Sequence, residues 1–281
     1  MILIADSGST KTDWILFNTG AEKINFSTQG LNPYFINSVE IQTELRNVFT
    51  DFALNNGVKK IFFYGAGCSS DPMKKVVFDG LQPVFKNADI TIKSDLLGAT
   101  RALFFNEPGI AVILGTGSNT CLYDGNTVAK TIRSLGYIFG DEGGGTHIGK
   151  LFISYFLSNK LSDELKNKFI NRYNLTKDQI LQKVYSEPFP NSFLASFCSF
   201  INENSSFAEI EDILNHSFSE LFRNYICKYP DYRNYKIRVA GSIGQIFEKQ
   251  LRKTASQFKT DIDLILQRPI TKLVEFHTNN N

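Results

Sequence analysis

Short apolar runs separated by glycine- and hydroxyl-rich turns open the chain. Residues 1–5 are entirely apolar and end at Asp6, and a second run at residues 13–17 follows a turn around Gly8. A third run spans about residues 22–28. Runs of this length, bounded by turn residues, are typical of strands, so the sequence predicts a three-strand meander.

The next segment changes to helical spacing. Apolar residues at positions 41, 45, 48, 49 and 52 predict an amphipathic helix that is capped by Asn37 or Ser38 and continues to Gly57. Shorter patterns predict strands at 60–64 and 89–93 and helices at 72–85 and 96–105. Together these elements form one βββαβαβα unit.

A second unit of the same kind begins near Gly109. Strands are predicted at 110–114, 118–123 and 127–132, and residues 114–118 repeat the strand–glycine–hydroxyl turn of the opening. We interpret the repeat as an internal duplication. Residues 146–229 are helical in pattern and rich in phenylalanine, which predicts a packed core. The last predicted elements are strands at 236–240 and 262–266, a helix from the Gly241 turn to Phe258, and a helix that starts at Pro269.

Composition narrows the class of protein. The chain has 281 residues and a formal net charge of +2, which argues against nucleic acid or an anionic membrane surface as partner. No apolar stretch is long enough to span a bilayer or to act as a signal peptide, so we expect a cytoplasmic protein. The four cysteines lie far apart and lack the spacing of zinc or iron–sulfur sites.

The turn after the first strand has the chemistry of a phosphate site. Gly8 allows close approach of an anion, and Ser9, Thr10, Lys11 and Thr12 offer N–H, O–H and ammonium donors. Asp6 would face the metal of a metal–nucleotide. Taken alone, the same residues also suit an ordinary hairpin turn.

Four motifs in order resemble the BadF/BadG and N-acetylglucosamine kinase family, within the actin, Hsp70 and sugar-kinase superfamily, over nearly the whole chain. They are residues 6–14 (DSGSTKTDW), 94–102 (SDLLGATRA), 115–119 (GTGSN) and 140–143 (GDEG), and residues 239–242 (VAGS) are similar to the family's adenosine turn. The resemblance implies a duplicated actin-like ATPase fold of the α/β class (ribonuclease H-like), with two domains around a central cleft. The domains would span residues 1–106 and 107–267, the second with a helical insertion, and a final helix at about 268–281 would pack back on the first.

The resemblance also implies an activity, namely ATP-dependent phosphorylation of an amino sugar, N-acetylglucosamine or glucosamine, on its 6-hydroxyl. Asp95 would be the general base, although its place at a helix start also suits a plain N-cap. Asp6 would hold Mg²⁺. The ATP-binding residues would be Gly8, Ser9, Thr10, Lys11, Thr12, Gly115, Thr116, Gly117, Gly241 and Ser242. The sugar-binding residues would be Asn32, Ser118, Asn119, Gly136 and Asp141.

Several alternatives remain open at this level. Asn32 precedes a proline and also suits a turn, and residues 140–145 also suit a flexible acidic loop. Residues 133–136 (RSLG) replace the family's frequent Gly-Gly-Trp-Gly, which puts the identity of the sugar in doubt. An ATPase that drives a partner protein and a non-catalytic sugar sensor are the other functions considered, and a homodimer is compatible with the resemblance. A dinucleotide-binding oxidoreductase is disfavoured because no Gly-x-Gly-x-x-Gly opens a helix after a strand.

Overall fold

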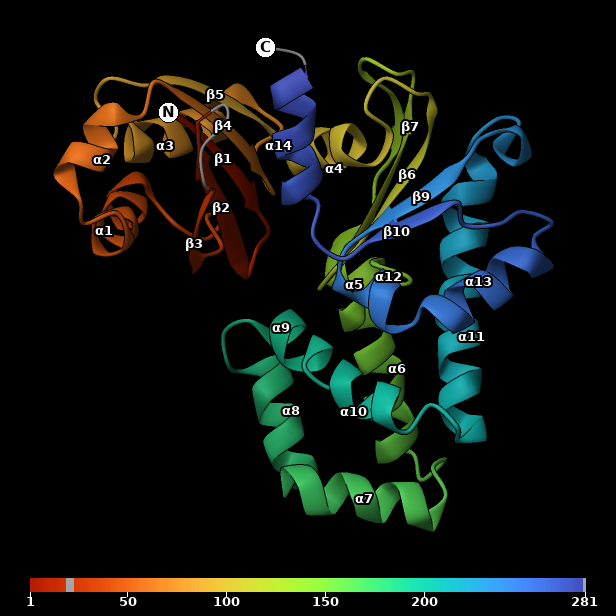
Figure 1. Ribbon diagram of the computed structural model, residues 1–281. Coiled ribbons are helices and arrows are strands. Elements are labelled where there is room, and N and C mark those ends of the chain that lie inside the picture. Colours follow the sequence, from red (N-terminus) through yellow and green to blue (C-terminus); the bar gives the residue numbers. More distant parts are fainter. Residues whose placement is uncertain (19–22, 280–281) are drawn as a thin grey trace. The chain divides into compact units, whose positions relative to one another are not determined.

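The computed structural model describes residues 1–18 and 23–279 and shows two compact units (Figure 1). Unit 1 comprises Met1–Glu107, Gly125–Val128 and Arg268–Asn281, and unit 2 comprises Pro108–Asp124 and Ala129–Gln267. Among the helices described, none is both long and apolar enough to cross a membrane.

Unit 1 is built on a mixed five-stranded sheet with the order β3-β2-β1-β4-β5. The strands are β1 (Ile2–Ser7), β2 (Lys11–Phe17), β3 (Ile24–Gln29), β4 (Lys60–Gly65) and β5 (Asp89–Ser94). β1 is antiparallel to β2 and parallel to β4, which in turn is parallel to β5. The predicted three-strand meander is therefore confirmed. Residue 22, where the third strand was expected to begin, lies outside the described residues.

Helices cover both faces of this sheet. Leu3 and Ala5 of β1 pack with α1 (Ser38–Val48) and α3 (Asp71–Leu81), whereas Ile4 packs with α4 (Asp95–Phe104) and α14 (Ile270–Asn279). This division follows from the alternation of side chains along a strand. The same alternation puts Asp6 on the α4 side.

Three predicted helices differ in extent from those of the structure. The helix expected at 72–85 ends at Leu81, and the one expected to run to Phe258 is divided into Ser242–Ile246 and Glu248–Gln257. The helix expected to run from Ser38 to Gly57 ends at Val48, and a separate short helix, α2 (Phe52–Gly57), follows. Asp51 causes the break, because its side chain accepts from the Leu54 backbone N–H at 3.0 Å and so caps a new helix. The predicted cap at Asn37 is confirmed as a capping box with Glu40.

Unit 2 repeats the strand order of unit 1. Its sheet has the order β10-β9-β6-β7-β8, with β6 again antiparallel to its meander partner β7 and parallel to β9. The strands are β6 (Gly109–Leu114), β7 (Ser118–Tyr123), β8 (Val128–Ile132), β9 (Ile237–Ala240) and β10 (Leu264–Leu266). Each strand has its counterpart in unit 1, so the predicted duplication is confirmed.

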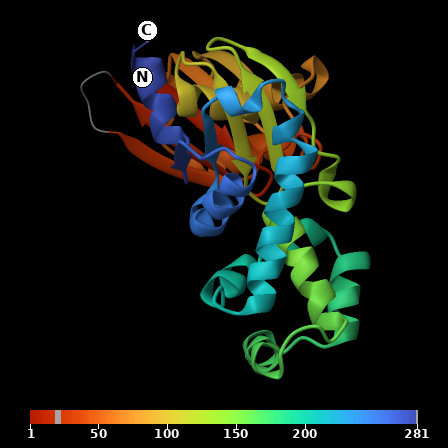
Figure 2. The same ribbon diagram turned by 90° about the vertical axis from the view of Figure 1, so that its right-hand side faces the viewer.

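The second unit differs from the first by a helical insertion between β8 and β9. Two long helices, α6 (Gly145–Leu157) and α11 (Ala208–Asn224), run side by side away from the sheet (Figures 1 and 2). The shorter helices are α5 (Gly136–Phe139), α7 (Asp163–Tyr173), α8 (Lys177–Tyr185), α9 (Pro190–Ala195) and α10 (Cys198–Glu203). After β9 come α12 (Ser242–Ile246) and α13 (Glu248–Gln257).

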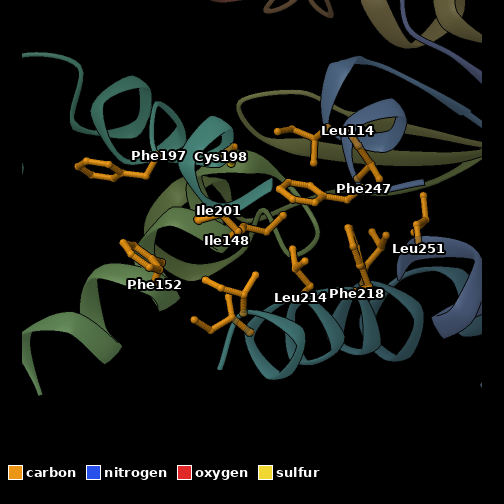
Figure 3. Close-up of a cluster of buried hydrophobic side chains, with 14 of the residues drawn as sticks. Leu114, Ile148, Phe152, Phe197, Cys198, Ile201, Leu214, Phe218, Phe247 and Leu251 are labelled. Atoms are coloured by element: carbon orange, nitrogen blue, oxygen red, sulfur yellow. The ribbon is translucent and has the colours of Figure 1, made fainter. Parts of the chain in front are cut away.

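The phenylalanine-rich segment builds the core of unit 2, as expected. Figure 3 shows side chains from β6, α6, α10, α11 and α13 pointing toward one another. Phe152, Phe197 and Phe218 are fully buried there. The core therefore joins the insertion firmly to the sheet.

Candidate functional site

The β1–β2 turn presents donors on an exposed loop. The Gly8 N–H donates to the Lys11 carbonyl at 2.9 Å, and Gly8, Ser9, Thr10 and Lys11 are all exposed. Thr12 is different: its side chain is fully buried and its hydroxyl bonds to Ser7 Oγ at 2.8 Å and to the Gln29 carbonyl at 3.0 Å. Thr12 thus supports the turn from behind.

The loop after β3 packs directly on this turn. The Gly30 N–H donates to the Thr10 carbonyl at 3.0 Å, and a Cβ at Gly30 would lie 2.3 Å from the backbone of Ser9. Asn32 is buried, donates from Nδ2 to Ser9 Oγ at 3.0 Å and accepts from the Tyr34 N–H at Oδ1. The structure therefore brings Asn32 to the phosphate-type turn, where its amide forms a local turn as well.

Two carboxylates face each other across β1 and β2. Asp6 and Asp13 are register partners on the side of the sheet that α4 covers. Burial, followed by the charges of Asp95 and Asp13, raises the pKa of Asp6 to about 7. Lys11 Nζ lies 2.5 Å from Asp13 Oδ1 and so neutralises part of this negative charge.

Asp95 begins α4 but does not cap it. The cap is Ser94, whose side chain accepts from the Leu97 N–H at 3.3 Å, so the N-cap interpretation of Asp95 is wrong. Asp95 Oδ1 accepts from the Leu96 N–H at 2.8 Å. Burial raises the pKa of Asp95, and backbone N–H groups at the helix start oppose that rise.

In unit 2 the β6–β7 turn is held by the N-terminus of α6. The Gly145 N–H donates to the Gly115 carbonyl at 2.9 Å, and the Thr146 N–H and hydroxyl both donate to the Thr116 carbonyl at 2.8 Å. Ser118 is buried, and Asn119 accepts from the Thr120 N–H through its side chain. The third sequence motif is therefore held by the residues that follow the fourth motif at the start of α6.

Asp141 lies over this second turn. Its Oδ1 accepts from the Ser134 hydroxyl at 2.6 Å and from the Ser118 N–H at 3.3 Å, and a Cβ at Gly117 would lie 2.7 Å from Oδ2. Gly136 lies nearby in sequence at the start of α5, and its N–H donates to Ser134 Oγ at 3.1 Å. The Asp141 carboxylate is thus held in place by hydrogen bonds from Ser134 and Ser118.

Gly241 is required by the fold itself. Its φ is +117°, and a Cβ would lie 2.2 Å from the Leu114 carbonyl at the end of β6. L-residues with a side chain avoid this conformation, so glycine is the residue that fits. Ser242 is exposed as the first residue of α12, which corrects the expectation of a separate turn before the helix.

The predicted residues fall into two groups. Unit 1 brings together Asp6, the first turn, Asn32 and Asp95, and unit 2 brings together the second turn, Asp141 and the end of β9 at Gly241. Sequence reasoning gave no role to Asp13, Gly30 or Ser134. Asp13 stands within the first motif and its β2 position opposite Asp6 could have been read from the hairpin, whereas nothing local to Gly30 or Ser134 signals their contacts.

The carboxylates of unit 1 suit a hard divalent cation. Asp6 supplies oxygen donors, and the neighbouring Asp13 and Asp95 add negative charge. Among the residues described, no group of three His, Cys, Asp or Glu side chains is arranged to hold a metal. In proteins Mg²⁺ is commonly held by one or two carboxylates while water and phosphate complete its shell, and Asp6 is a residue that could serve in this way.

Comparison with known proteins gives a relative that spans the chain at substantial sequence identity. It is a crystal structure described as a "putative N-acetylglucosamine kinase" from Porphyromonas gingivalis, 34% identical, with a TM-score of 0.94, covering 100% of this chain and 99% of its own. No family model matches the chain, and no curated protein matches it.

More distant structures share the fold. A second "putative N-acetylglucosamine kinase", from Chromobacterium violaceum, is 15% identical with a TM-score of 0.68 and covers 98% of each chain. A ROK family glucokinase from Streptomyces griseus, in complex with glucose and AMPPNP, is 12% identical with a TM-score of 0.56, covering 99% of this chain and 98% of its own. Since the first relative is more than 30% identical over its whole length, the chain belongs to the N-acetylglucosamine kinase family of sugar kinases, on the actin-like ATPase fold.

Proposed function

We propose that the protein transfers the γ-phosphoryl group of ATP to the 6-hydroxyl of an amino sugar, N-acetylglucosamine or glucosamine. The observation that carries the proposal is the position of Asp95: Ser94 caps α4, so the Asp95 carboxylate is not needed for the cap and lies close enough to Asp6 to raise its pKa. A carboxylate beside a cation site is what the transfer needs as base.

Unit 1 would then supply the proton acceptor and the metal ligand. Asp95 would accept the proton of the attacking hydroxyl, and Asp6 would hold Mg²⁺. When bound, that ion neutralises charge on the β- and γ-phosphates. Ser9, Thr10 and Lys11 would donate to the phosphates from their exposed turn, and Gly8 would allow the phosphates to approach its backbone closely.

Unit 2 would supply further contacts to the sugar and the nucleotide, in addition to Asn32 and the first turn of unit 1. Asp141 would accept hydrogen bonds from sugar hydroxyls, which allows a polar site to reject analogues that lack them. Gly115, Thr116 and Gly117 would approach the phosphates from the second turn, and Gly241 and Ser242 would lie beside the adenosine. Because ATP is a cytoplasmic substrate, the cytoplasm is the expected compartment.

The choice of an amino sugar rests on the 34% identical relative and its description as an N-acetylglucosamine kinase. Other members of the fold are described as acting on different sugars, such as the glucokinase bound to glucose. The sugar must therefore be established by experiment.

The test is a coupled assay of ATP consumption with Mg²⁺ against a panel of sugars. The panel contains N-acetylglucosamine, glucosamine, N-acetylmannosamine, glucose and 6-deoxy-N-acetylglucosamine. We expect one amino sugar to give equal amounts of ADP and sugar phosphate, and the 6-deoxy analogue to give neither.

Each other result selects another function. ADP release that no sugar stimulates would favour an ATPase that drives a partner. Sugar binding in calorimetry without ADP formation would favour a sensor. Phosphorylation of the 6-deoxy analogue would move the reaction to another hydroxyl.

A further inference from the structure

We propose that Ser134 is a positioning residue that aims the Asp141 carboxylate at the sugar and thereby sets sugar affinity. The inference rests on the proposed sugar site at Asp141. Ser134 lies between β8 and α5, in the segment where residues 133–136 depart from the family pattern.

Every hydrogen-bonding position of the Ser134 hydroxyl is used. Its oxygen accepts from the Asp141 N–H at 2.9 Å and from the Gly136 N–H at 3.1 Å. Its proton is then donated to Asp141 Oδ1, 2.6 Å away. A hydroxyl has one donor and two acceptor positions, so Ser134 can make no further bond without giving up one of these.

These bonds fix both the backbone and the carboxylate of Asp141. Asp141 has a φ of +61°, a left-handed conformation that an aspartate adopts at some cost in energy, and the bond from its N–H to Ser134 helps to hold it. At the carboxylate, Oδ1 is occupied by the Ser134 hydroxyl and the Ser118 N–H. Oδ2 is thereby left as the oxygen that can accept from a sugar hydroxyl.

Gly117 limits the carboxylate from the other side. A Cβ at Gly117 would lie within 3.0 Å of Oδ1, Oδ2 and Cγ of Asp141, so the carboxyl group rests directly on the glycine backbone. Without the Ser134 hydroxyl, the carboxylate can turn away from this position. The sugar would then bind a carboxylate that has several orientations. Ordering the Asp141 carboxylate on binding costs free energy, which lowers the affinity for the sugar.

The experiment compares Ser134→Ala with wild type using N-acetylglucosamine. We expect the KM for the sugar to rise about tenfold or more, the loss expected when a hydrogen bond to a charged group is removed. The KM for ATP should stay within about twofold, because no described contact of Ser134 reaches the first turn. Ser199→Ala is the matched control, since Ser199 donates to the Glu203 carboxylate at 3.0 Å on the exposed side of α10.

A hydroxyl-bearing variant separates positioning from folding. Ser134→Thr keeps the donor and should restore the sugar KM to near wild type, whereas the near-isosteric Ser134→Cys, a weak donor, should stay impaired even if Ser134→Ala does not fold. A normal sugar KM in Ser134→Cys or in folded Ser134→Ala would overturn the inference while the kinase activity of wild type still stands. Wild type that phosphorylates no panel sugar would instead remove the proposed function.

Discussion

At the residue scale, the central feature is a group of acids that repel one another. Asp6 and Asp13 are opposite one another on β1 and β2, and the charge of Asp95 also acts on Asp6. Burial, and then the like charges of Asp95 and Asp13, disfavour the ionised state of Asp6 and so cost stability in the unliganded protein. Such a cost is expected at a site that binds a cation, because the bound cation would offset the negative charge of these carboxylates.

We expect Asp6→Asn to stabilise unit 1 by an amount that grows between about pH 4 and pH 7 and is largest above pH 7. The native pKa of about 7 exceeds the unperturbed value of 3.8, so the folded chain holds a proton that the unfolded chain has lost between about pH 4 and pH 7. Stability therefore falls as pH rises through that window, and the full cost is present above pH 7. A rise in the Asp6 pKa from 3.8 to about 7 corresponds to at most about 4 kcal/mol, and we expect a gain of about 2 kcal/mol because solvent reaches part of the side chain.

The measurement is urea unfolding at pH 4.5 and pH 8, followed by the fluorescence of Trp14. This residue is the chain's one tryptophan and is buried in unit 1, so it reports on that unit. An equal effect of Asp6→Asn at both pH values would contradict the raised pKa of Asp6. The variant should also lose Mg²⁺-dependent nucleotide binding if Asp6 is the metal ligand.

Asp95→Asn tests the general base. The amide keeps the size of the side chain and can still accept from the Leu96 N–H, but it cannot take up the hydroxyl proton. We expect kcat to fall roughly 10²–10⁴-fold with little change in sugar KM. A change in KM alone would make Asp95 a sugar-binding residue, and near-normal kcat would make Asp141 the next candidate.

At the scale of elements, two glycines near the first turn have opposite requirements. A Cβ on Gly8 would lie 3.5 Å from the Lys11 carbonyl, an ordinary contact, whereas one on Gly30 would overlap the Ser9 backbone at 2.3 Å. The fold therefore leaves room for a side chain at Gly8, so a glycine there would serve ligand binding. At Gly30 the packing itself requires glycine.

This contrast makes Gly8→Val a clean test of the phosphate turn. We expect the variant to unfold at the wild-type urea concentration and to bind AMPPNP more than about tenfold more weakly in calorimetry, because its side chain would occupy the space of the phosphate. Gly30→Ala serves as comparison and should unfold more easily. Wild-type nucleotide affinity in Gly8→Val would remove this turn from the site.

The last helix, α14, is attached to unit 1 by a buried polar network. Arg101 of α4 donates to the Tyr64 hydroxyl at 2.8 Å, and that hydroxyl lies 2.8 Å from His277 Nε2. Burial, with the charges of Arg101 and Lys60, lowers the pKa of His277 to about 4. The neutral imidazole can therefore accept the Tyr64 proton.

Tyr64→Phe should destabilise unit 1 by about 1–3 kcal/mol, because it leaves both buried partners without this hydroxyl. Urea unfolding followed by Trp14 fluorescence measures the effect. Tyr185→Phe, at a side chain that is 81% exposed, is the control and should change nothing. Equal stability of the two variants would mean that apolar packing alone holds α14.

Most of the strands could be predicted from the pattern of apolar and turn residues. The strands at residues 60–64, 89–93 and 118–123 are found within one residue of their expected bounds, because apolar runs between turn residues mark them locally. The break at Asp51 was missed because an aspartate inside an apolar repeat is also compatible with a continuous helix. The Ser134–Asp141 contact was missed because it depends on a left-handed backbone that no local pattern reveals.

At the scale of the whole molecule, the two copies of one strand order carry different parts of the proposed site. Unit 1 holds the proposed base, the proposed metal ligand and Asn32, and unit 2 holds the other proposed sugar residues. Phosphoryl transfer requires both sets around one ATP, in a place from which water is excluded.

We therefore expect binding of both ligands to make the protein more compact. Small-angle scattering should show a smaller radius of gyration with AMPPNP, Mg²⁺ and N-acetylglucosamine together than with either ligand alone. Asp141→Asn, which weakens the proposed sugar contact, should reduce the change at a fixed sugar concentration. A radius that responds to neither ligand would rule out domain closure.

The packing of α14 also bears on how the chain folds while it is being synthesised. Ile4 and Ile15 lie on strands that are synthesised before unit 2, yet Ile270, Leu273 and Val274, which pack with them, are synthesised after every residue of unit 2. Domains usually complete themselves in the order of their synthesis. Here an apolar face of the unit 1 sheet stays partly uncovered until α14 has been synthesised. Unit 2 can therefore reach its native structure before unit 1. We expect chaperones that bind during translation to bind mainly to the strands of unit 1.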